Sequence, residues 1–98
     1  FRTVAPIEVD TFKLLTGELN IYVKTAESGT KHPQSFCPEC GSAIYSTTLG
    51  DGPKVHNIRL GTARQRDALV PKLQIWARSA QPWLGDLAAV GKIDKQPY

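Results

Sequence analysis

The sequence is poor in cysteine, with two cysteines in 98 residues. Secreted mini-domains that depend on disulfides typically need at least about four, so a disulfide framework is excluded. No apolar run approaches the ~20 residues of a membrane-spanning helix, and no signal-peptide pattern is present. We therefore expect a cytoplasmic protein in a reducing compartment, without a membrane partner.

Motifs of several enzyme classes are also missing. No serine stands in a Gly-x-Ser-x-Gly setting, and neither a P-loop nor a dinucleotide-binding fingerprint occurs. Glu8 and Asp10 fit surface or turn positions better than an acid/base pair. These absences exclude serine-hydrolase, P-loop and Rossmann-type chemistry.

The positive charge is small and dispersed. Twelve Lys and Arg against nine Asp and Glu give a net charge of +3, and the densest basic group is Arg59, Arg64 and Arg66. Because a nucleic-acid-binding surface normally clusters its basic residues, we expect no nucleic-acid partner. A small anionic ligand near these arginines stays open as an alternative to simple solvation.

The length favours a single domain over residues 1–98, with one small core. Of these residues, 41% are hydrophobic and 21% charged, as in a soluble globular domain. The chain begins at Phe1, inside an expected strand and without Met, so we expect that an N-terminal segment is missing.

Short β-strands separated by Gly and Pro turns dominate the pattern. Leu19, Ile21 and Val23 alternate with polar residues, which predicts a strand with one buried face. The Ser28-Gly29 turn then leads into a return strand, which we expect at a sheet edge because Pro33 lacks an N–H. The expected strands cover residues 1–5, 19–24, 32–36, 42–48, 54–60 and 73–77, with strong turn signals at 50–53.

Helical signals are weak and short. Pro82-Trp83-Leu84 suits one helical turn, and further turns are conceivable at Asp10 and within residues 63–71. Trp76 and Trp83 are expected in the core because each would bury a large area in so small a domain. The sequence therefore predicts a mostly antiparallel β-domain.

The chemistry-bearing motif is Cys37-Pro38-Glu39-Cys40-Gly41. The Cys-x-x-Cys spacing with Pro and Gly describes a tight turn that aims two sulfurs at one point, which is half of a tetrahedral zinc site. A thioredoxin-type redox pair should open a helix, whereas a β-like run follows here. We therefore favour zinc as the cofactor, with Cys37 and Cys40 as metal ligands.

Zinc needs four ligands, and the chain offers only two histidines besides the cysteines. His32 is the better candidate and His56 the weaker one. Their spacing matches no standard metal motif, so an ordinary surface or edge role is favoured for both. We expect the other ligands in the missing N-terminal segment.

An ordered set of short motifs resembles the glutathione-dependent formaldehyde-activating enzyme (centromere protein V-like) family. The set covers nearly the whole chain: Phe12-Lys13-Leu14, Gly17-Glu18-Leu19, Tyr22, Ser28-Gly29, Phe36-Cys37-Pro38-Glu39-Cys40-Gly41-Ser42, Tyr45, Gly61-Thr62, Pro71, Gln74-Ile75-Trp76 and Pro82-Trp83.

The resemblance implies small antiparallel sheets in a β-tent around a zinc knuckle, with one or two helical turns. It also implies that Cys37 and Cys40 provide half of a structural zinc site. The implied activity is that of a carbon–sulfur lyase acting on glutathione–formaldehyde adducts. From charge alone, Arg59, Arg64 or Arg66 could steer the carboxylates of glutathione, although surface solvation is the favoured role for them. The alternative is a non-catalytic zinc-binding or interaction domain of the same fold.

Overall fold

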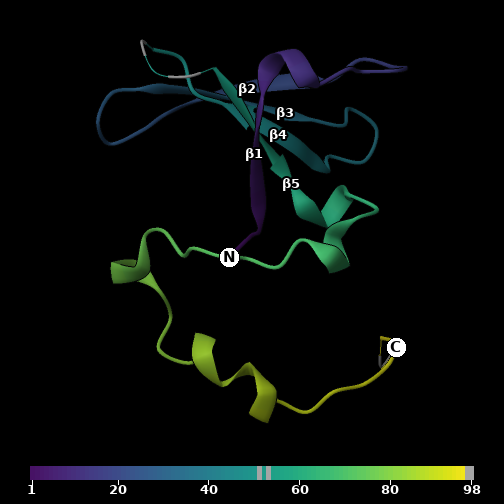
Figure 1. The fold of residues 1–98 in the computed structure, drawn as a ribbon, viewed down its shortest axis with the longest axis vertical. Helices are drawn as coiled ribbons and strands as arrows, with labels where there is room; N and C mark the ends of the chain where they lie inside the picture. Colours follow the sequence, from purple (N-terminus) through teal and green to yellow (C-terminus); the bar gives the residue numbers. More distant parts are fainter. Residues whose placement is uncertain (51, 53, 97–98) are drawn as a thin grey trace.

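The structure is a computed structural model that describes residues 1–50, 52 and 54–96. Five strands form one antiparallel sheet in the order β1-β5-β4-β3-β2 (Figure 1). The strands are β1 (Val4–Glu8), β2 (Asn20–Thr25), β3 (Lys31–Phe36), β4 (Ala43–Thr47) and β5 (Val55–Arg59). The mostly-β antiparallel fold is therefore confirmed, whereas the β-tent arrangement and the single-domain boundaries stay predictions.

Short 3-10 helices connect and follow the strands. They are η1 (Val9–Thr11), η2 (Leu60–Thr62), η3 (Arg66–Ala68), η4 (Ala77–Ser79) and η5 (Leu84–Ala89). The helical turn expected near Pro82 is confirmed by η5, and the conceivable turns at Asp10 and within residues 63–71 are present as η1 and η3.

The β2–β3 hairpin forms as the sequence predicts. Its ladder runs from Asn20 opposite Phe36 to Thr25 opposite Lys31. In the turn, the Gly29 N–H donates to the Ala26 carbonyl at 2.8 Å. Gly29 has φ of 87°, a left-handed conformation that glycine adopts without strain. The hairpin thus places Phe36 at the entrance to the cysteine turn.

The first strand lies three residues later than expected. It covers Val4–Glu8 and continues through Pro6, where the sequence predicted its end. Because β1 is an edge strand, Pro6 needs no N–H on its open side and pairs with Asn57 of β5 on the other.

The prediction that the return strand lies at an edge is wrong, because β3 lies between β2 and β4. Pro33 is opposite Val23 of β2, and the β3–β4 register begins one residue later, at Gln34 opposite Ser46. The sheet therefore accommodates the missing N–H at the end of the β3–β4 ladder rather than at a free edge.

One face of the sheet carries an aromatic cluster. Phe12, from the segment after η1, packs edge-on against Tyr45 of β4 and His56 of β5, with ring centroids 4.9 and 5.4 Å apart. The Tyr45 and His56 rings are themselves 4.1 Å apart. This cluster ties the segment after η1 to strands β4 and β5 of the sheet.

The predicted buried face of β2 is not buried. All six residues of β2 are exposed, including Ile21 at 62% and Val23 at 49%. Alternation requires only that Ile21 and Val23 share a face. Since β2 is the outer strand of the sheet, the aromatic cluster over β4 and β5 does not extend to it.

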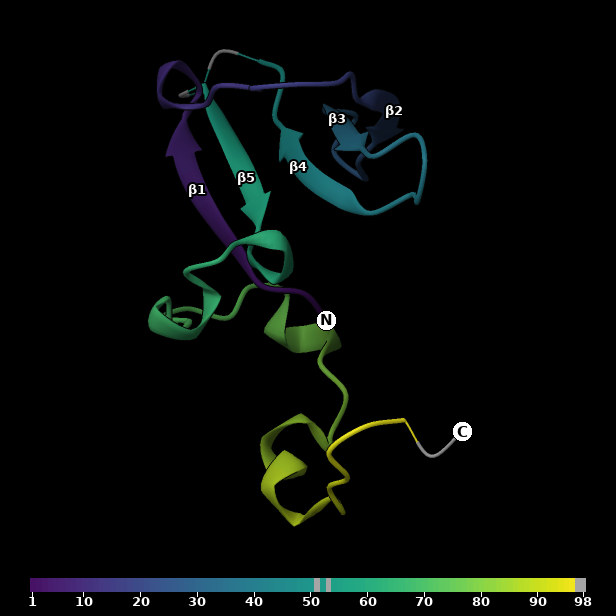
Figure 2. The same cartoon turned by 90° about the vertical axis from the view of Figure 1, so that its right-hand side faces the viewer.

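The expected strand at 73–77 is also wrong, since no strand follows Arg59 within residues 54–96. The segment after η3 instead runs away from the sheet in both views (Figures 1 and 2). Trp76 and Trp83 are 64% and 55% exposed, which corrects their assignment to the core. Residues 73–77 alternate like a strand, but in the described part of the chain they lie beside no other strand with which they could form backbone hydrogen bonds.

The turn predicted at 50–53 includes residues 51 and 53, which lie outside the described residues. Within the described part of the chain, no helix has both the length and the apolar character needed to cross a bilayer.

Candidate functional site

Backbone hydrogen bonds close the Cys-x-x-Cys turn. The Cys37 N–H donates to the Ser42 carbonyl at 2.9 Å, and the Gly41 N–H donates back to the Cys37 carbonyl at 2.8 Å. Gly41 closes the turn with φ of 76°, in the left-handed region that favours glycine. Cys37 is half-buried and Cys40 exposed, and both thiols are free.

Ser42 controls the environment of the second thiol. The Cys40 Sγ–H donates to Ser42 Oγ at 3.2 Å, and the same hydroxyl can donate to the sulfur once the thiol ionises. Hydrogen bonds from the Ser42 side chain and backbone, followed by one from Cys37, lower the pKa of the Cys40 thiol. Thiolate is the form that binds metals and attacks carbon, so the turn favours both uses.

A thioredoxin-like role lacks its usual support here. The segment after the turn enters strand β4 at Ala43, as the sequence predicts, and no helix begins at the cysteines. The lowered pKa of Cys40 therefore comes from local hydrogen bonds and not from a helix N-terminus.

Neither histidine lies at the cysteine turn. His32 lies five residues before Cys37, which is about 16 Å along an extended chain. His32 contacts Thr48 (Nδ1 to Oγ1, 3.3 Å) and lines a separate cavity of about 450 Å³ with Trp76. His56 lies opposite Thr47 of β4, and its Nδ1 is 2.8 Å from the Thr47 hydroxyl oxygen. Thr47 is five residues along the chain from Ser42, so His56 is also far from the cysteine turn.

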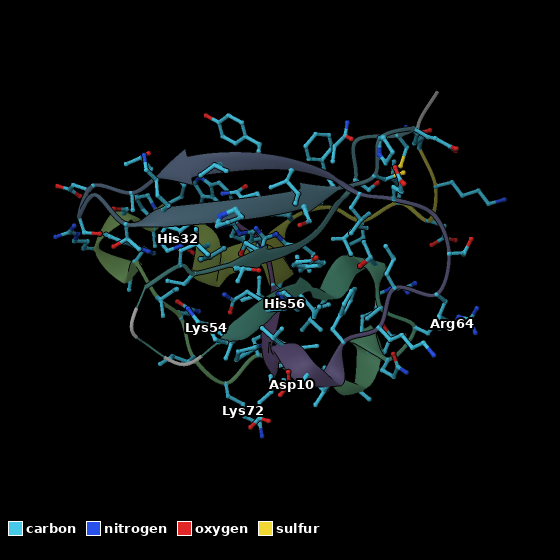
Figure 3. All side chains as sticks on the ribbon, turned by 90° about the horizontal axis from the view of Figure 1, so that it is seen from above. Asp10, His32, Lys54, His56, Arg64 and Lys72 are labelled. Carbon is cyan, nitrogen blue, oxygen red and sulfur yellow. The ribbon has the colours of Figure 1, made fainter. Side chains whose placement is uncertain are left out.

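Figure 3 labels His32 and His56 on different strands. Burial lowers the pKa of His56, which favours the neutral ring within the aromatic cluster. Both histidines are half-buried on inner strands, so the surface or edge position that the sequence favours for them is wrong.

The donor set covers half of a tetrahedral zinc site. No group of three or more His, Cys, Asp or Glu side chains suited to a metal ion occurs among residues 1–50, 52 and 54–96. Cys37 and Cys40 supply two thiolates where zinc takes four ligands. The described residues alone therefore do not form a complete zinc site.

A pocket of about 520 Å³ adjoins the cysteine turn, at the end of the sheet where β1 and β4 begin and β5 ends. Its lining includes Arg2, Thr3, Ser42, Arg59 and Thr62. Ser42 belongs both to this lining and to the hydrogen bond with Cys40. Ser42 therefore links the pocket lining to the thiol turn, although neither cysteine lines the pocket itself.

The three arginines that the sequence groups together occupy different environments. Arg59 is 7% exposed and lines the pocket, whereas Arg64 and Arg66 are exposed and lie outside its lining. Arg66 donates to the Ala63 carbonyl at 3.1 Å, and Arg64 projects from the edge of the molecule (Figure 3). Of the three, only Arg59 is placed to meet a ligand in this pocket.

A protein-family model described as glutathione-dependent formaldehyde-activating enzyme matches residues 1–79. The chain belongs to this family. The match covers the whole sheet, the cysteine turn and the pocket lining, and it supports a function related to glutathione and formaldehyde. Glutathione-dependent formaldehyde-activating enzymes generally bind zinc. Comparisons with curated proteins and with solved structures give no match.

The sequence alone does not reveal the roles of two residues in this site. Ser42 was identified only as part of a motif, although its position two residues after Cys40 suits a side-chain hydrogen bond. Arg2 was not identified, because its approach to Arg59 follows from the pairing of Val4 with Arg59 across β1 and β5. Local spacing indicates the first relationship, whereas only strand register produces the second.

Proposed function

We propose that this protein makes or breaks the carbon–sulfur bond of a glutathione–formaldehyde adduct. In the forming direction the thiol sulfur bonds to the formaldehyde carbon, the carbon–oxygen π bond breaks, and the thiol proton moves to oxygen. The observation that carries the proposal is the family match over residues 1–79. The open pocket beside the thiol turn supports it, because its volume suits a small-molecule substrate.

In this proposal Cys37 and Cys40 are two ligands of a zinc ion, and the remaining ligands come from groups other than the described residues. Bound zinc would supply a Lewis acid that stabilises a thiolate or polarises a carbonyl. The Ser42 hydroxyl would donate a hydrogen bond to the Cys40 thiolate and so fix the orientation of that ligand.

A non-catalytic zinc-binding domain is the second candidate function. The exposure of Cys40 and the backbone bonds that join the turn to the start of β4 favour it, since both suit a structural knuckle at the end of a sheet. In that case metal binding would stabilise the fold without accelerating any reaction.

Two measurements on the purified chain test these candidates. NMR exchange spectroscopy with glutathione and ¹³C-formaldehyde should show faster adduct exchange than in protein-free buffer. Metal analysis should find zinc that is lost in Cys37→Ser and Cys40→Ser, together with a lower melting temperature. Zinc without rate enhancement would select the non-catalytic domain, and a metal-free wild type that melts like both variants would refute the zinc assignment.

A further inference from the structure

Arg59 is a buried cation that forms no ion pair with the residues that the structure describes. Its side chain extends from the end of β5 on the face opposite the aromatic cluster, where Asn57 and Ser46 pair across the strands. Burial and the charge of Arg2 both lower the pKa of its guanidinium. An arginine stays protonated under these conditions, so two positive charges meet at this pocket. Buried charges are normally paired, which makes this position unusual.

The guanidinium is held in one orientation and still has donors to spare. Nη1 donates to Ser46 Oγ at 3.4 Å and to the Asn57 carbonyl at 3.3 Å. These are the hydrogen bonds that the group makes within the described residues. No buried side-chain nitrogen there lacks a partner, so Nη2 and Nε keep access to solvent. A planar guanidinium fixed in this way presents two parallel donors, which is the arrangement that binds a carboxylate.

Ser42 links the pocket that holds this donor pair to the cysteine turn. Arg59 and Ser42 line the same space, and Ser42 bonds to Cys40. A ligand held at Arg59 by one end would therefore extend along Ser42 toward the cysteine turn. The lining also carries the Thr3 and Thr62 side chains, although the Thr62 hydroxyl already donates to the Arg59 carbonyl at 2.8 Å.

We infer that Arg59, assisted by Arg2, binds a carboxylate of the glutathione adduct and orients its sulfur toward the cysteine turn. This inference rests on the proposed function for the identity of the substrate. It goes beyond that function by naming the residues that recognise the substrate's charge.

Binding of S-methylglutathione and of its diethyl ester, measured by calorimetry, tests the inference. The blocked sulfur removes any contribution from thiol chemistry, and esterification removes the negative charge of both carboxylates. The acid should bind wild type at least about tenfold more tightly than the ester, as expected for a charge-assisted hydrogen-bond pair. Arg59→Gln should lose most of this preference, with at most the smaller share from Arg2 remaining.

Arg64→Gln is the matched control, because it removes the same charge from an exposed residue outside the pocket lining. It should keep the preference for the acid. Circular dichroism checks that Arg59→Gln folds. Should it not fold, Arg2→Gln provides the second test, since Arg2 is exposed and its loss should reduce the preference by about threefold.

Equal binding of acid and ester to wild type would overturn the inference, as would a full preference in a folded Arg59→Gln or in Arg2→Gln. The proposed function fails separately, if no rate enhancement is found while the arginine-dependent preference persists. Conversely, rate enhancement with a preference that Arg59→Gln leaves unchanged would refute the inference alone.

Discussion

The Cys40 sulfur lies 3.2 Å from the Ser42 hydroxyl oxygen, and Ser42 also lines the pocket that contains Arg2 and Arg59. One residue thus joins the thiol turn to the space in which a ligand fits. A change at Ser42 should therefore affect the thiol chemistry directly, without disturbing the strand ladders, which begin at Ala43 on β4.

Ser42→Ala should raise the pKa of the Cys40 thiol, because the hydroxyl hydrogen bond is the largest influence that lowers it. Less thiolate would then be present near neutral pH, and Cys40 should react more slowly with iodoacetamide. Mass spectrometry across a pH series measures this rate for the metal-free protein. Ser28→Ala, in the exposed turn between β2 and β3, is the control and should leave the rate unchanged. An unaltered Cys40 profile in Ser42→Ala would contradict the assignment.

Gly41→Ala should destabilise the protein by about 1 kcal/mol, because at a positive φ the Cβ of alanine comes too close to the backbone carbonyl oxygen. The backbone there has φ of 76°, and the space around it is open, so conformation and not crowding sets the effect. Gly85→Ala is the matched control, since Gly85 also has open space but no positive φ. Urea unfolding should separate the two variants, and equal midpoints would show that the turn adapts to alanine.

Phe12→Ala should destabilise the protein by about 2 kcal/mol, which is less than a fully buried phenylalanine loses. Its ring is half-buried against Tyr45 and His56. Trp83→Ala, at an exposed side chain, should cost less despite removing a larger ring. Thermal or urea unfolding measures both. A larger loss for Trp83→Ala would restore the core role that the sequence predicted for this tryptophan.

Stability should fall as the pH is lowered through the titration of His56. Burial depresses its pKa from the ordinary 6.5, so the unfolded chain binds the proton more readily than the folded one. The stabilising contribution is present above pH 6.5 and is lost as the pH falls through the depressed folded pKa. Urea midpoints between pH 7.5 and 5 should show a decline that is smaller in His56→Asn.

His32→Asn provides the comparison for that series. It removes the other histidine, which contacts Thr48, the residue next to the Thr47 that His56 contacts. The decline should persist in His32→Asn at nearly the wild-type size. A decline that vanishes in His32→Asn and persists in His56→Asn would contradict the assignment of the decline to His56.

Local patterns predicted the elements whose causes are local. The Ser28-Gly29 turn and the alternation on either side specify the β2–β3 hairpin, because turn geometry and strand period act over a few residues. The Cys37–Gly41 turn was predicted for the same reason, as was the strand after it. The family resemblance was also visible in the sequence, and the family match confirms it.

Patterns failed where burial depends on what lies opposite. Ile21 and Ile75 have the same alternating surroundings in the sequence, but one lies on an uncovered edge strand and the other in no strand at all. Pro6 and Pro33 look alike as strand breakers, yet β1 is an edge and β3 is not. Pairing partners decide these cases, and they are remote in the chain.

By itself, the sequence determined the antiparallel β-character, the β2–β3 hairpin and the two-thiol turn, since each follows from residues within hydrogen-bonding reach along the chain. Only the tertiary structure separated Arg59 from Arg64 and placed it beside Arg2 and Ser42. The reason is physical: β1, β4 and β5 come together through inter-strand hydrogen bonds, and the pocket exists only where their ends meet.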